Sequence, residues 1–431
     1  MADISPFRAL RYDPKRVGIS TVVTQPYDKI TPEMREKYYA ASPYNLVRII
    51  LGKREPDEAG NNVYTRAASF FQGWRKDGVL CPEPNPSIFS YTQHFQAPGS
   101  PTEHLRRGLI ALGRVEDYAA GVVFRHEQTL AKPKADRLEL LRSTRAHFGQ
   151  IFMLYEDSGE IDNLLASNEN IDTDVSDEYG VRHRVSPISD AKLIRQVQEK
   201  MRDKKLIIAD GHHRYETALA YRDEKRASTR ANDPDAPHEF VMMTFVNMNS
   251  PGLVILPTHR VVHSLASFSE ADFLAKSRKY FNVEEVDSSV DEARCTGLLR
   301  QAGRAGTAIL AITPERDFLL HTPRAFGSEV FAGLSIRQQS LDVVQLHKVL
   351  LETVLGLSAE SIRNQENLSY IRETSEALTR VRSGGANIAF LMNPVRMQQV
   401  RDIAFAGEVL PQKSTDFYPK LLSGLAGYAL D

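Results

Sequence analysis

Cysteine is scarce in this sequence. Its two cysteines, Cys81 and Cys295, stand far apart and belong to no metal-ligand or redox motif. Such a pair builds no disulfide framework and suits a reducing compartment, so a cytoplasmic location is expected. No apolar run approaches the length of a membrane span, and the N-terminus lacks the basic and apolar segments of a signal peptide. We therefore expect no membrane partner.

The sequence also lacks an excess of charge of either sign, since it contains 54 Lys and Arg residues and 55 Asp and Glu residues. A net charge near zero provides no electrostatic footprint for DNA, so a nucleic-acid partner is not expected. Neither a P-loop nor the motif set of protein kinases occurs. Any phosphate site must therefore be built in another way.

Helices alternating with short strands predict an α+β or mixed α/β fold. The length of 431 residues allows two or three domains, and we divide the chain into parts 1–105, 106–270 and 271–431. Segments with clear periodicity or capping signals are expected at 45–51 (strand), 62–77 (helix), 87–96 (strand), 151–155 (strand), 191–201 (helix), and 308–313 with 318–321 (hairpin).

The most informative stretch spans residues 206–219. The apolar run 206–209 predicts a buried strand, Asp210-Gly211 predicts a turn, and 215–225 predicts an amphipathic helix. Where a strand stops and a helix begins, free backbone N–H groups and the positive end of the helix dipole come together. Such a corner can bind an anion.

Basic side chains follow this turn directly: His212, His213 and Arg214. Together with Gly211, which lets the backbone approach a ligand, they predict a phosphate cradle. Asp210 is the candidate ligand for Mg²⁺, a cation that prefers carboxylate and water. In the simpler alternative Asp210 caps the helix and the histidines lie on the surface. A zinc site is disfavoured, because adjacent side chains point apart and no third ligand stands at suitable spacing.

Asp-Gly-His-His-Arg after an apolar strand resembles the signature of the ParB/sulfiredoxin superfamily, and within it most of all the free-serine kinases, which phosphorylate L-serine from ADP or ATP. The longer Ala-Asp-Gly-His-His-Arg-Tyr-Glu-Thr-Ala-Leu is similar to a large bacterial family of unknown function, often labelled ParB-like. Further motifs of that family are Gln25-Pro26-Tyr27-Asp28, His126-Glu127-Gln128-Thr129, Asp136-Arg137-Leu138, Leu256-Pro257-Thr258-His259-Arg260 and Lys413-Ser414-Thr415.

The resemblance implies a ParB/sulfiredoxin-like mixed core at 106–270, with an added N-terminal α/β unit and a C-terminal α+β unit that closes the site. In the serine kinases, a His-Glu pair upstream of the signature supplies the base, and here that pair is His126-Glu127. A carboxylate within reach of a hydroxyl can accept its proton as the phosphoryl group moves. The alternative for Glu127 is a solvated loop acid.

The segment ending in Lys413-Ser414-Thr415 resembles a C-terminal segment of the serine kinases that lies beside substrate and phosphate. Asp416-Phe417 follows where the kinases carry Arg-His, which leaves the substrate more open than the phosphate. The alternative is a turn before a C-terminal helix. Lys134, Asp136 and Arg137 could add to the phosphate site or form surface pairs.

We therefore expect a kinase that uses Mg²⁺ and ADP or ATP to phosphorylate free L-serine or a similar metabolite, and that could form a homodimer. The alternative is a ParB-like nucleotide-binding regulatory or DNA-partition module, or a binding protein that lost activity. Sulfiredoxin-like repair is set aside, because His212 occupies the place of the required cysteine. The candidate residues are Glu127, Asp210, His212 and His213 for catalysis, Asp210 for the metal, and Gly211, Arg214, Lys413, Ser414, Thr415 and His126 for nucleotide or phosphate.

Overall fold

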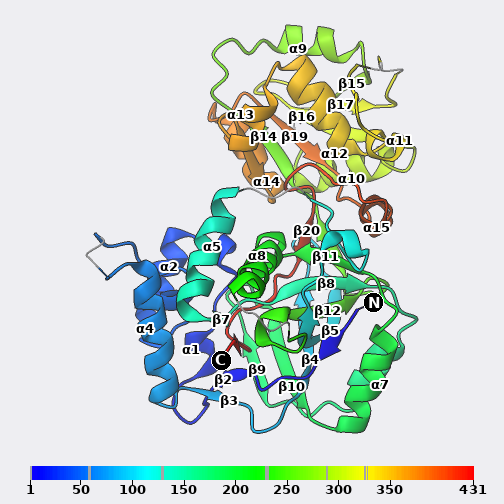
Figure 1. The fold of residues 1–431 in the computed structure, drawn as a ribbon. Helices are drawn as coiled ribbons and strands as arrows, with labels where there is room; N and C mark the ends of the chain where they lie inside the picture. The colour runs from blue at the N-terminus through cyan, green and yellow to red at the C-terminus, as the bar shows by residue number, and fades with distance from the viewer. Residues whose placement is uncertain are drawn as a thin grey trace. The chain divides into compact units, whose positions relative to one another are not determined.

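The computed structural model describes residues 2–56, 60–127, 131–228, 233–287, 290–324, 327 and 329–431, without the side chains of 131–133. The chain forms two compact units (Figure 1). Unit 1 comprises Met1–Arg125, Thr129–Val254 and Phe417–Asp431, and unit 2 comprises His126–Gln128 and Ile255–Asp416. Both mix helices and strands, which confirms the α+β class.

Unit 1 is built on a mixed sheet with the strand order β6-β11-β8-β12-β5-β4-β10-β9, and β1 pairs with β5. Strand β11 runs parallel to β6 and antiparallel to β8, whereas β8 runs parallel to β12. The strands are β1 (Ile4–Ser5), β4 (Ile88–Gln96), β5 (Glu103–Arg114), β6 (Val123–Phe124), β8 (Ile151–Tyr155), β9 (Thr173–Ser176), β10 (Arg182–Ile188), β11 (Leu206–Asp210) and β12 (Phe240–Asn247).

The predicted boundary at residue 105 falls inside β5, whose pairing with β4 joins the first two predicted parts in one sheet. Central strands β8 and β12 are buried along their whole length, which explains their unbroken apolar sequences. Strand β11, the second strand from the β6 edge, carries Asp210 at its carboxyl end.

Helix α7 of unit 1 follows its sequence signals closely. Helix α7 begins after Asp190, whose carboxylate accepts a hydrogen bond from the backbone N–H of Leu193. Its apolar residues recur at helical spacing and pack on the core of the sheet. The helices are α1 (Ile19–Val22), α2 (Pro32–Ala41), α3 (Val47–Ile50), α4 (Val63–Lys76), α5 (Ala131–Thr144), α6 (Glu160–Ala166), α7 (Ala191–Met201) and α8 (His212–Ser228), with 3₁₀ turns at η1 (Tyr27–Lys29), η2 (Tyr118–Ala120) and η3 (Pro237–Glu239).

The strand predicted at 45–51 is wrong, because the chain there forms the short helix α3. Its apolar, β-branched residues favour a strand by propensity alone. However, the Asn45 side chain accepts a hydrogen bond from the backbone N–H of Val47 (3.0 Å), and Ile49 and Ile50 are buried in a second core of unit 1. Burial in this core therefore overrides local preference.

Unit 2 contains an antiparallel sheet in the order β15-β17-β16-β19-β14-β18. The hairpin predicted from 308 to 321 is confirmed as β16 and β17. Alternate residues of β16 enter different cores, as a strand covered on both faces requires. The strands are β14 (His259–Val262), β15 (Asn282–Val286), β16 (Ala308–Ile312), β17 (Asp317–His321), β18 (Leu368–Ile371) and β19 (Ile388–Met392).

Helices pack on both faces of this second sheet. Residues of α9, the π-helix η4 and α15 share one core, and residues of α10 and α14 share the other. The helices are α9 (Glu270–Ser277), α10 (Glu292–Ala302), α11 (Ile336–Gln339), α12 (Asp342–Gln345), η4 (Leu346–Val354), α13 (Ala359–Asn364), α14 (Thr374–Arg382) and α15 (Met397–Phe405).

The remaining strands are short. Strand β2 pairs with β3 and β7 pairs with β21, so that both the N-terminal and C-terminal segments are tied into unit 1. They are β2 (Leu10–Tyr12), β3 (Leu80–Pro82), β7 (Ala146–His147), β13 (Val254–Leu256), β20 (Asp416–Tyr418) and β21 (Tyr428–Ala429).

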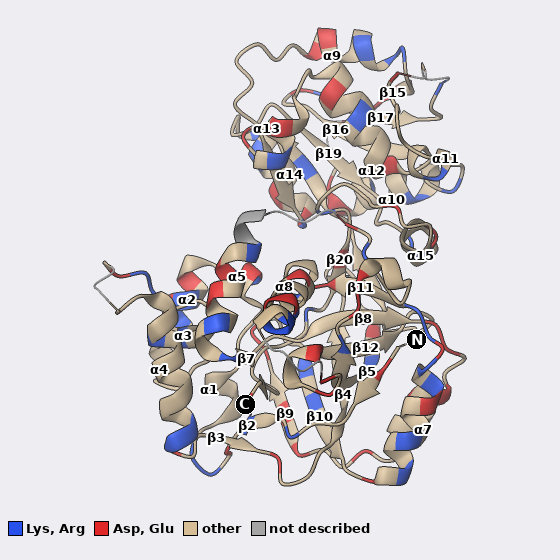
Figure 2. Ribbon diagram, in the orientation of Figure 1, with Lys and Arg blue, Asp and Glu red and all other residues tan. Residues whose placement is uncertain are grey.

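Surface charge is mixed in sign. Figure 2 shows Lys and Arg next to Asp and Glu on α7, which agrees with the near-zero net charge. Within the described part of the chain, no helix has both the length and the apolar character needed to cross a membrane.

Gly252 provides a test of the fold, because its backbone lies against that of β5. A Cβ atom there would overlap the carbonyl group of Leu105 and lie 2.7 Å from the backbone nitrogen of Arg106. We expect Gly252→Ala to lower the free energy of unfolding by at least about 2 kcal/mol. Denaturant unfolding followed by circular dichroism would measure the change.

Gly18→Ala is the matched control, because a Cβ at Gly18 would meet no atom within 4 Å. We expect its stability to stay within about 0.5 kcal/mol of the parent protein. Equal stabilities of the two variants would contradict the close approach at Gly252.

Candidate functional site

The strand–turn–helix unit predicted around residue 210 is confirmed. Strand β11 ends at Asp210 and helix α8 begins at His212, so Gly211 makes the turn. Gly211 has φ +96°, a conformation that residues with a Cβ rarely adopt. A Cβ there would also lie 3.0 Å from Nε of Arg214, because the arginine side chain folds back over the turn. Both conditions require glycine.

Asp210 holds two cations. Its Oδ2 accepts a hydrogen bond from Nη2 of Arg214 (2.6 Å), and its Oδ1 accepts one from Nζ of Lys420 (3.1 Å). Arg214 also donates to the carbonyl of Gln150 through Nη1. The side chains of Arg214 and Lys420 are only 15% and 9% exposed, so these contacts are screened less than surface ion pairs. We call Asp210, Gly211, Arg214 and Lys420 the phosphate corner.

The phosphate corner is electropositive. Burial opposes ionisation of Asp210, but Lys420, Arg214 and Lys29 outweigh it and hold the pKa of the carboxyl well below its ordinary value. Three cations therefore act on one carboxylate beside the N-terminus of a 17-residue helix. Such an excess of positive charge next to the positive end of a helix dipole suits a phosphate.

A buried network positions Lys420. The Arg106 side chain, 1% exposed, donates to the carbonyl of Tyr418 through Nη1 (3.0 Å) and to the carbonyl of Pro419 through Nη2. Gln93 Nε2 donates to the carbonyl of Lys420 itself (2.9 Å) and its Oε1 accepts from Arg106. These bonds fix the backbone from which the Lys420 side chain reaches Asp210. Burial lowers the pKa of Arg106 to about 10, so it stays charged at neutral pH.

The two histidines of the motif both lie in the first turn of α8. His212 is buried, whereas His213 is partly exposed, and the hydroxyl of Thr217 donates to the His213 carbonyl (2.7 Å). Their adjacent positions on one helix give them different surroundings. Their catalytic roles stay predictions.

Glu127 belongs to a second cluster, within unit 2. Its Oε1 accepts hydrogen bonds from the backbone N–H and from the hydroxyl of Thr415, both at 3.0 Å. Nε2 of the buried His126 lies 2.8 Å from the same hydroxyl oxygen. If the threonine proton points to Glu127, then His126 donates through Nε2–H and the three groups form one chain. The backbone of His126 is tied to Leu410 as well (2.7 Å).

The second carboxylate oxygen of Glu127 has no hydrogen-bond partner among the described residues. The side chain is 16% exposed, so the carboxylate is held in place without being fully buried. The unbonded oxygen can still accept a hydrogen bond, and the role of Glu127 as a base stays a prediction. The continuation of the motif, Gln128-Thr129, lies outside the described residues.

Only Thr415 of the predicted Lys413-Ser414-Thr415 site joins Glu127. Ser414 is buried, and its hydroxyl donates to the carbonyl of Pro411 within the loop. Lys413 is exposed and has φ +57°, with its carbonyl accepting from Arg260 (3.2 Å). The loop is therefore a turn that presents Thr415, and phosphate binding by Lys413 and Ser414 stays a prediction.

The residues at which this chain departs from the serine kinases have structural roles. The carboxylate of Asp416 pairs with Arg372 of unit 2 at 2.6 Å. The ring of Phe417 is buried and packs edge-on against Phe152 of unit 1, with centroids 5.7 Å apart. Asp416-Phe417 therefore stabilises the segment between Thr415 and Lys420.

The motif Thr258-His259-Arg260, for which the sequence offers no mechanism, is buried in unit 2. His259 accepts a hydrogen bond from the backbone N–H of Met392 through Nδ1 (3.2 Å), and its Nε2 lies 3.0 Å from the Thr374 hydroxyl. Arg260 donates to the carbonyls of Thr258 and Lys413. These contacts support the loop that carries Thr415.

The residues of the phosphate corner do not build a metal site by themselves. Both oxygens of Asp210 are engaged by cations, and Mg²⁺ would have to replace the Lys420 contact. Among the described residues, no group of three or more His, Cys, Asp or Glu side chains could hold a metal ion. Metal binding at Asp210 is thus not supported by its contacts and stays a prediction.

The structure groups the predicted residues into two clusters. Asp210, Gly211 and Arg214 meet in unit 1, whereas Glu127, His126 and Thr415 meet in unit 2. Sequence reasoning missed Lys420 and Arg106. The one available signal for Lys420 was its position five residues after Thr415.

The chain belongs to a family whose members are described as a protein of unknown function, DUF1015. The family model matches residues 4–344, which include the β11–α8 turn and Glu127. No curated protein matches the chain.

Several solved structures have weak overall similarity to this chain. A conserved hypothetical protein from Pyrococcus furiosus is 13% identical with a TM-score of 0.34, covering 69% of this chain and 87% of that protein. A free serine kinase in complex with ADP is 12% identical with a TM-score of 0.36, covering 69% of this chain and 84% of the kinase. SbnI from Staphylococcus aureus is 8% identical with a TM-score of 0.35, covering 74% of this chain and 88% of that protein. TM-scores of this size do not establish a shared fold.

The buried side chain of His259, next to Arg260, predicts a loss of stability in acid. Burial and the nearby Arg260 charge lower the pKa of His259 to about 4. The unfolded chain therefore binds a proton near pH 6.5, whereas the folded chain resists protonation until about pH 4. We expect His259 to contribute a loss of roughly 3 kcal/mol in unfolding free energy as the pH falls from 7 to 4.

Urea titrations at several pH values would measure this slope. His259→Gln keeps a donor and an acceptor but does not titrate, so its stability should depend less on pH over that range. His263→Gln, at a less buried position of unit 2, should keep the parent's slope. An unchanged slope in His259→Gln would contradict the prediction.

Proposed function

We propose that this protein is a nucleotide-dependent kinase that phosphorylates the hydroxyl of free L-serine or a similar small metabolite. The observation that carries the proposal is the phosphate corner, in which Arg214 and Lys420 pair with the carboxylate of Asp210 beside the start of α8, and the charge of Lys29 also acts on that carboxylate. The resemblance of Asp-Gly-His-His-Arg and His126-Glu127 to the free-serine kinases supports the same reaction. A ParB/sulfiredoxin-like core is part of this proposal.

In this proposal the phosphate corner binds the terminal phosphates of ADP or ATP. A phosphoryl group in transfer carries negative charge on its oxygens, and fixed donors stabilise it more than mobile ones. Arg214 is fixed by Asp210 and by the carbonyl of Gln150, and Lys420 by Asp210 and the Arg106 network. These cations are therefore ordered before the nucleotide arrives, which lowers the entropic cost of binding.

Glu127 is the proposed base. The unbonded oxygen of its carboxylate takes the proton from the acceptor hydroxyl. The hydroxyl oxygen forms a bond to the terminal phosphorus of the nucleotide while the bridging P–O bond breaks, which releases AMP from ADP or ADP from ATP. Thr415 holds the other oxygen through two hydrogen bonds, so the carboxylate cannot turn away. His126, linked to the same threonine hydroxyl, completes the support. Mg²⁺ would be supplied with the nucleotide, since the cations on Asp210 leave little room for direct coordination.

A nucleotide-binding regulatory module is the second candidate, because the phosphate corner can bind a nucleotide without any step at Glu127. Such a protein would bind ADP or ATP and transfer no phosphate. Binding of DNA that weakens steeply with salt would favour a partition module instead. The cytoplasmic location and a homodimer stay predictions.

Glu127→Gln tests the proposed reaction. Glutamine can still accept the Thr415 hydrogen bonds but cannot take a proton, so we expect kcat to fall by roughly 10²- to 10⁴-fold with nucleotide binding nearly unchanged. Phosphorus NMR would detect O-phosphoserine formed from Mg²⁺, ADP or ATP, and a panel of hydroxyl-bearing amino acids.

Glu366→Gln, an exposed glutamate of the same unit, is the control and should retain parent activity. Full turnover by Glu127→Gln would exclude the assigned base. Nucleotide binding with no phosphorylated product from any acceptor, in the parent protein, would favour the regulatory module.

Lys420→Met tests the phosphate corner. The substitution keeps much of the side-chain volume and removes one buried charge, so we expect the Kd of ADP to rise by roughly tenfold to a hundredfold. Isothermal titration calorimetry would measure this change. Lys192→Met, on the exposed side of α7, is the control and should bind ADP like the parent. Equal affinities of both variants would remove Lys420 from the site.

A further inference from the structure

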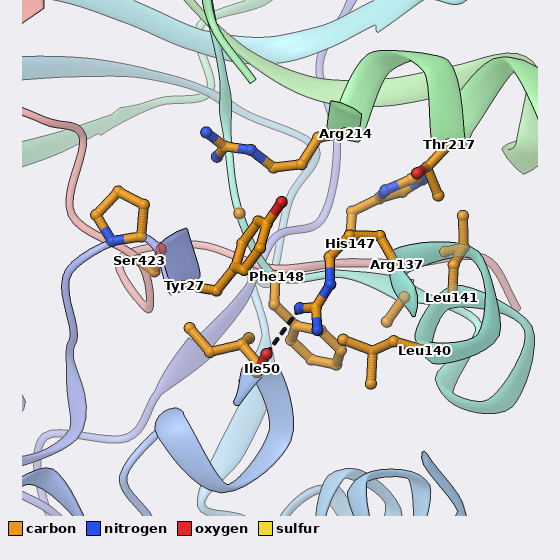
Figure 3. A pocket seen from close by; sticks show the side chains of 13 residues that line it. Tyr27, Ile50, Arg137, Leu140, Leu141, His147, Phe148, Arg214, Thr217 and Ser423 are labelled. Atoms are coloured by element: carbon orange, nitrogen blue, oxygen red, sulfur yellow. Dashed lines mark hydrogen bonds between the residues drawn. The ribbon is translucent and has the colours of Figure 1, made fainter. Parts of the chain in front are cut away.

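A pocket of unit 1 is lined by Arg214 and by two sequence motifs to which the proposed function assigns no role (Figure 3). Pro26 and Tyr27 come from the first motif, and Arg137 comes from the second. The pocket encloses ≈ 570 Å³, including space open to solvent.

The pocket is continuous with the phosphate corner through Arg214. This side chain binds Asp210 and also lines the pocket. In Figure 3 the Tyr27 ring lies between the Arg214 and Arg137 side chains. Burial raises the pKa of the Tyr27 phenol, the charges of Asp28 and Asp210 also raise it, and those of Arg214 and Arg137 lower it. A ligand whose phosphates occupy the corner could thus extend into the pocket.

The positive charge of Arg137 is already balanced. Its Nε donates to Asp136 (2.9 Å) and its Nη1 donates to the carbonyl of Ile50 (2.7 Å). Its guanidinium carbon lies 4.3 Å from the centre of the Tyr27 ring. Tyr64 holds Asp136 in turn with a hydrogen bond of 2.9 Å. Arg137 therefore forms a rigid wall that fixes Tyr27. Among the described residues that line the pocket, no cation is left unpaired for a second anionic group.

Two polar groups in the pocket have no protein partner. Within the described residues, neither the Tyr27 hydroxyl nor either ring nitrogen of His147 makes a hydrogen bond. Burial lowers the pKa of His147 to about 4, so at neutral pH its ring is uncharged and offers one donor and one acceptor. The imidazole stacks on Tyr428, with ring centroids 6.2 Å apart, which fixes its plane.

The rest of the lining is largely apolar. The side chains of Leu140, Leu141, Ala146 and Phe148 are buried and form part of the wall. An apolar ligand would leave the Tyr27 hydroxyl and the His147 nitrogens unsatisfied, and a charged one would lack a counter-ion. A flat, neutral ring with apolar faces and polar edges satisfies both parts of the lining.

We propose that this pocket binds the heterocyclic base of the nucleotide, with the Tyr27 hydroxyl and the His147 imidazole bonding to the base edge. The inference rests on the proposed function, which places the phosphates of the same nucleotide at the phosphate corner. It assigns a role to the N-terminal motif around Tyr27 and to Asp136-Arg137: they build the wall that selects the base.

Calorimetric titration of the full chain with ADP, GDP, CDP, UDP and inorganic pyrophosphate tests the pocket. We expect one nucleoside diphosphate to bind more tightly than the others and than pyrophosphate. Tyr27→Phe removes only the hydroxyl, and His147→Phe keeps a ring on Tyr428 but removes both nitrogens. Each should weaken the preferred diphosphate by roughly 3- to 10-fold, with pyrophosphate affinity within about twofold of the parent.

Tyr179→Phe, at a tyrosine that is 56% exposed, is the matched control and should leave both affinities unchanged. Pyrophosphate binding by each variant shows that the phosphate corner has folded. If both pocket variants leave the preference among bases unaltered, or if the parent binds pyrophosphate as tightly as every nucleotide, the base pocket is excluded and the phosphate corner stands. If the parent protein binds neither pyrophosphate nor any of the nucleotides, both the proposed function and the base pocket are excluded.

Discussion

The ion pairs of Asp210 with Arg214 and Lys420 are the interaction on which the candidate site depends. A carboxylate at the end of a buried strand would be unfavourable alone, and two cations close to a helix N-terminus would repel each other and the dipole. Together the three groups are stable, and they leave a net positive charge. The corner is thus held ready for an anion by contacts that need no ligand.

This arrangement ties distant parts of the chain together. Asp210 and Lys420 are 210 residues apart, and Lys420 reaches the corner only because the C-terminal segment returns to unit 1. Buried Arg106 holds the backbone of that segment by its carbonyls. A bent backbone with carbonyls facing inward needs donors there, and a guanidinium supplies several in fixed directions. The same packing therefore builds the core of unit 1 and positions the side chains of the phosphate corner.

Glu127 shows the same dependence within unit 2. Neighbouring residues His126 and Glu127 both converge on Thr415, which lies 288 residues further along the chain from Glu127. The support for the loop includes buried Arg260 and the turn closed by Ser414. A carboxylate with one oxygen bound by Thr415 is a consequence of this packing.

From sequence alone, local features followed directly: the strand that ends at Asp210, the turn at Gly211 and helix α7 all depend on residues that are neighbours in the chain. Local preference also predicted a strand at 45–51. This prediction was wrong, because residue preferences do not include the core that buries α3. Lys420 and the pocket around Tyr27 were decided only by tertiary structure. A lysine or a tyrosine carries no signal of its partner when that partner is hundreds of residues away, since the contact arises from how sheets and loops pack rather than from spacing.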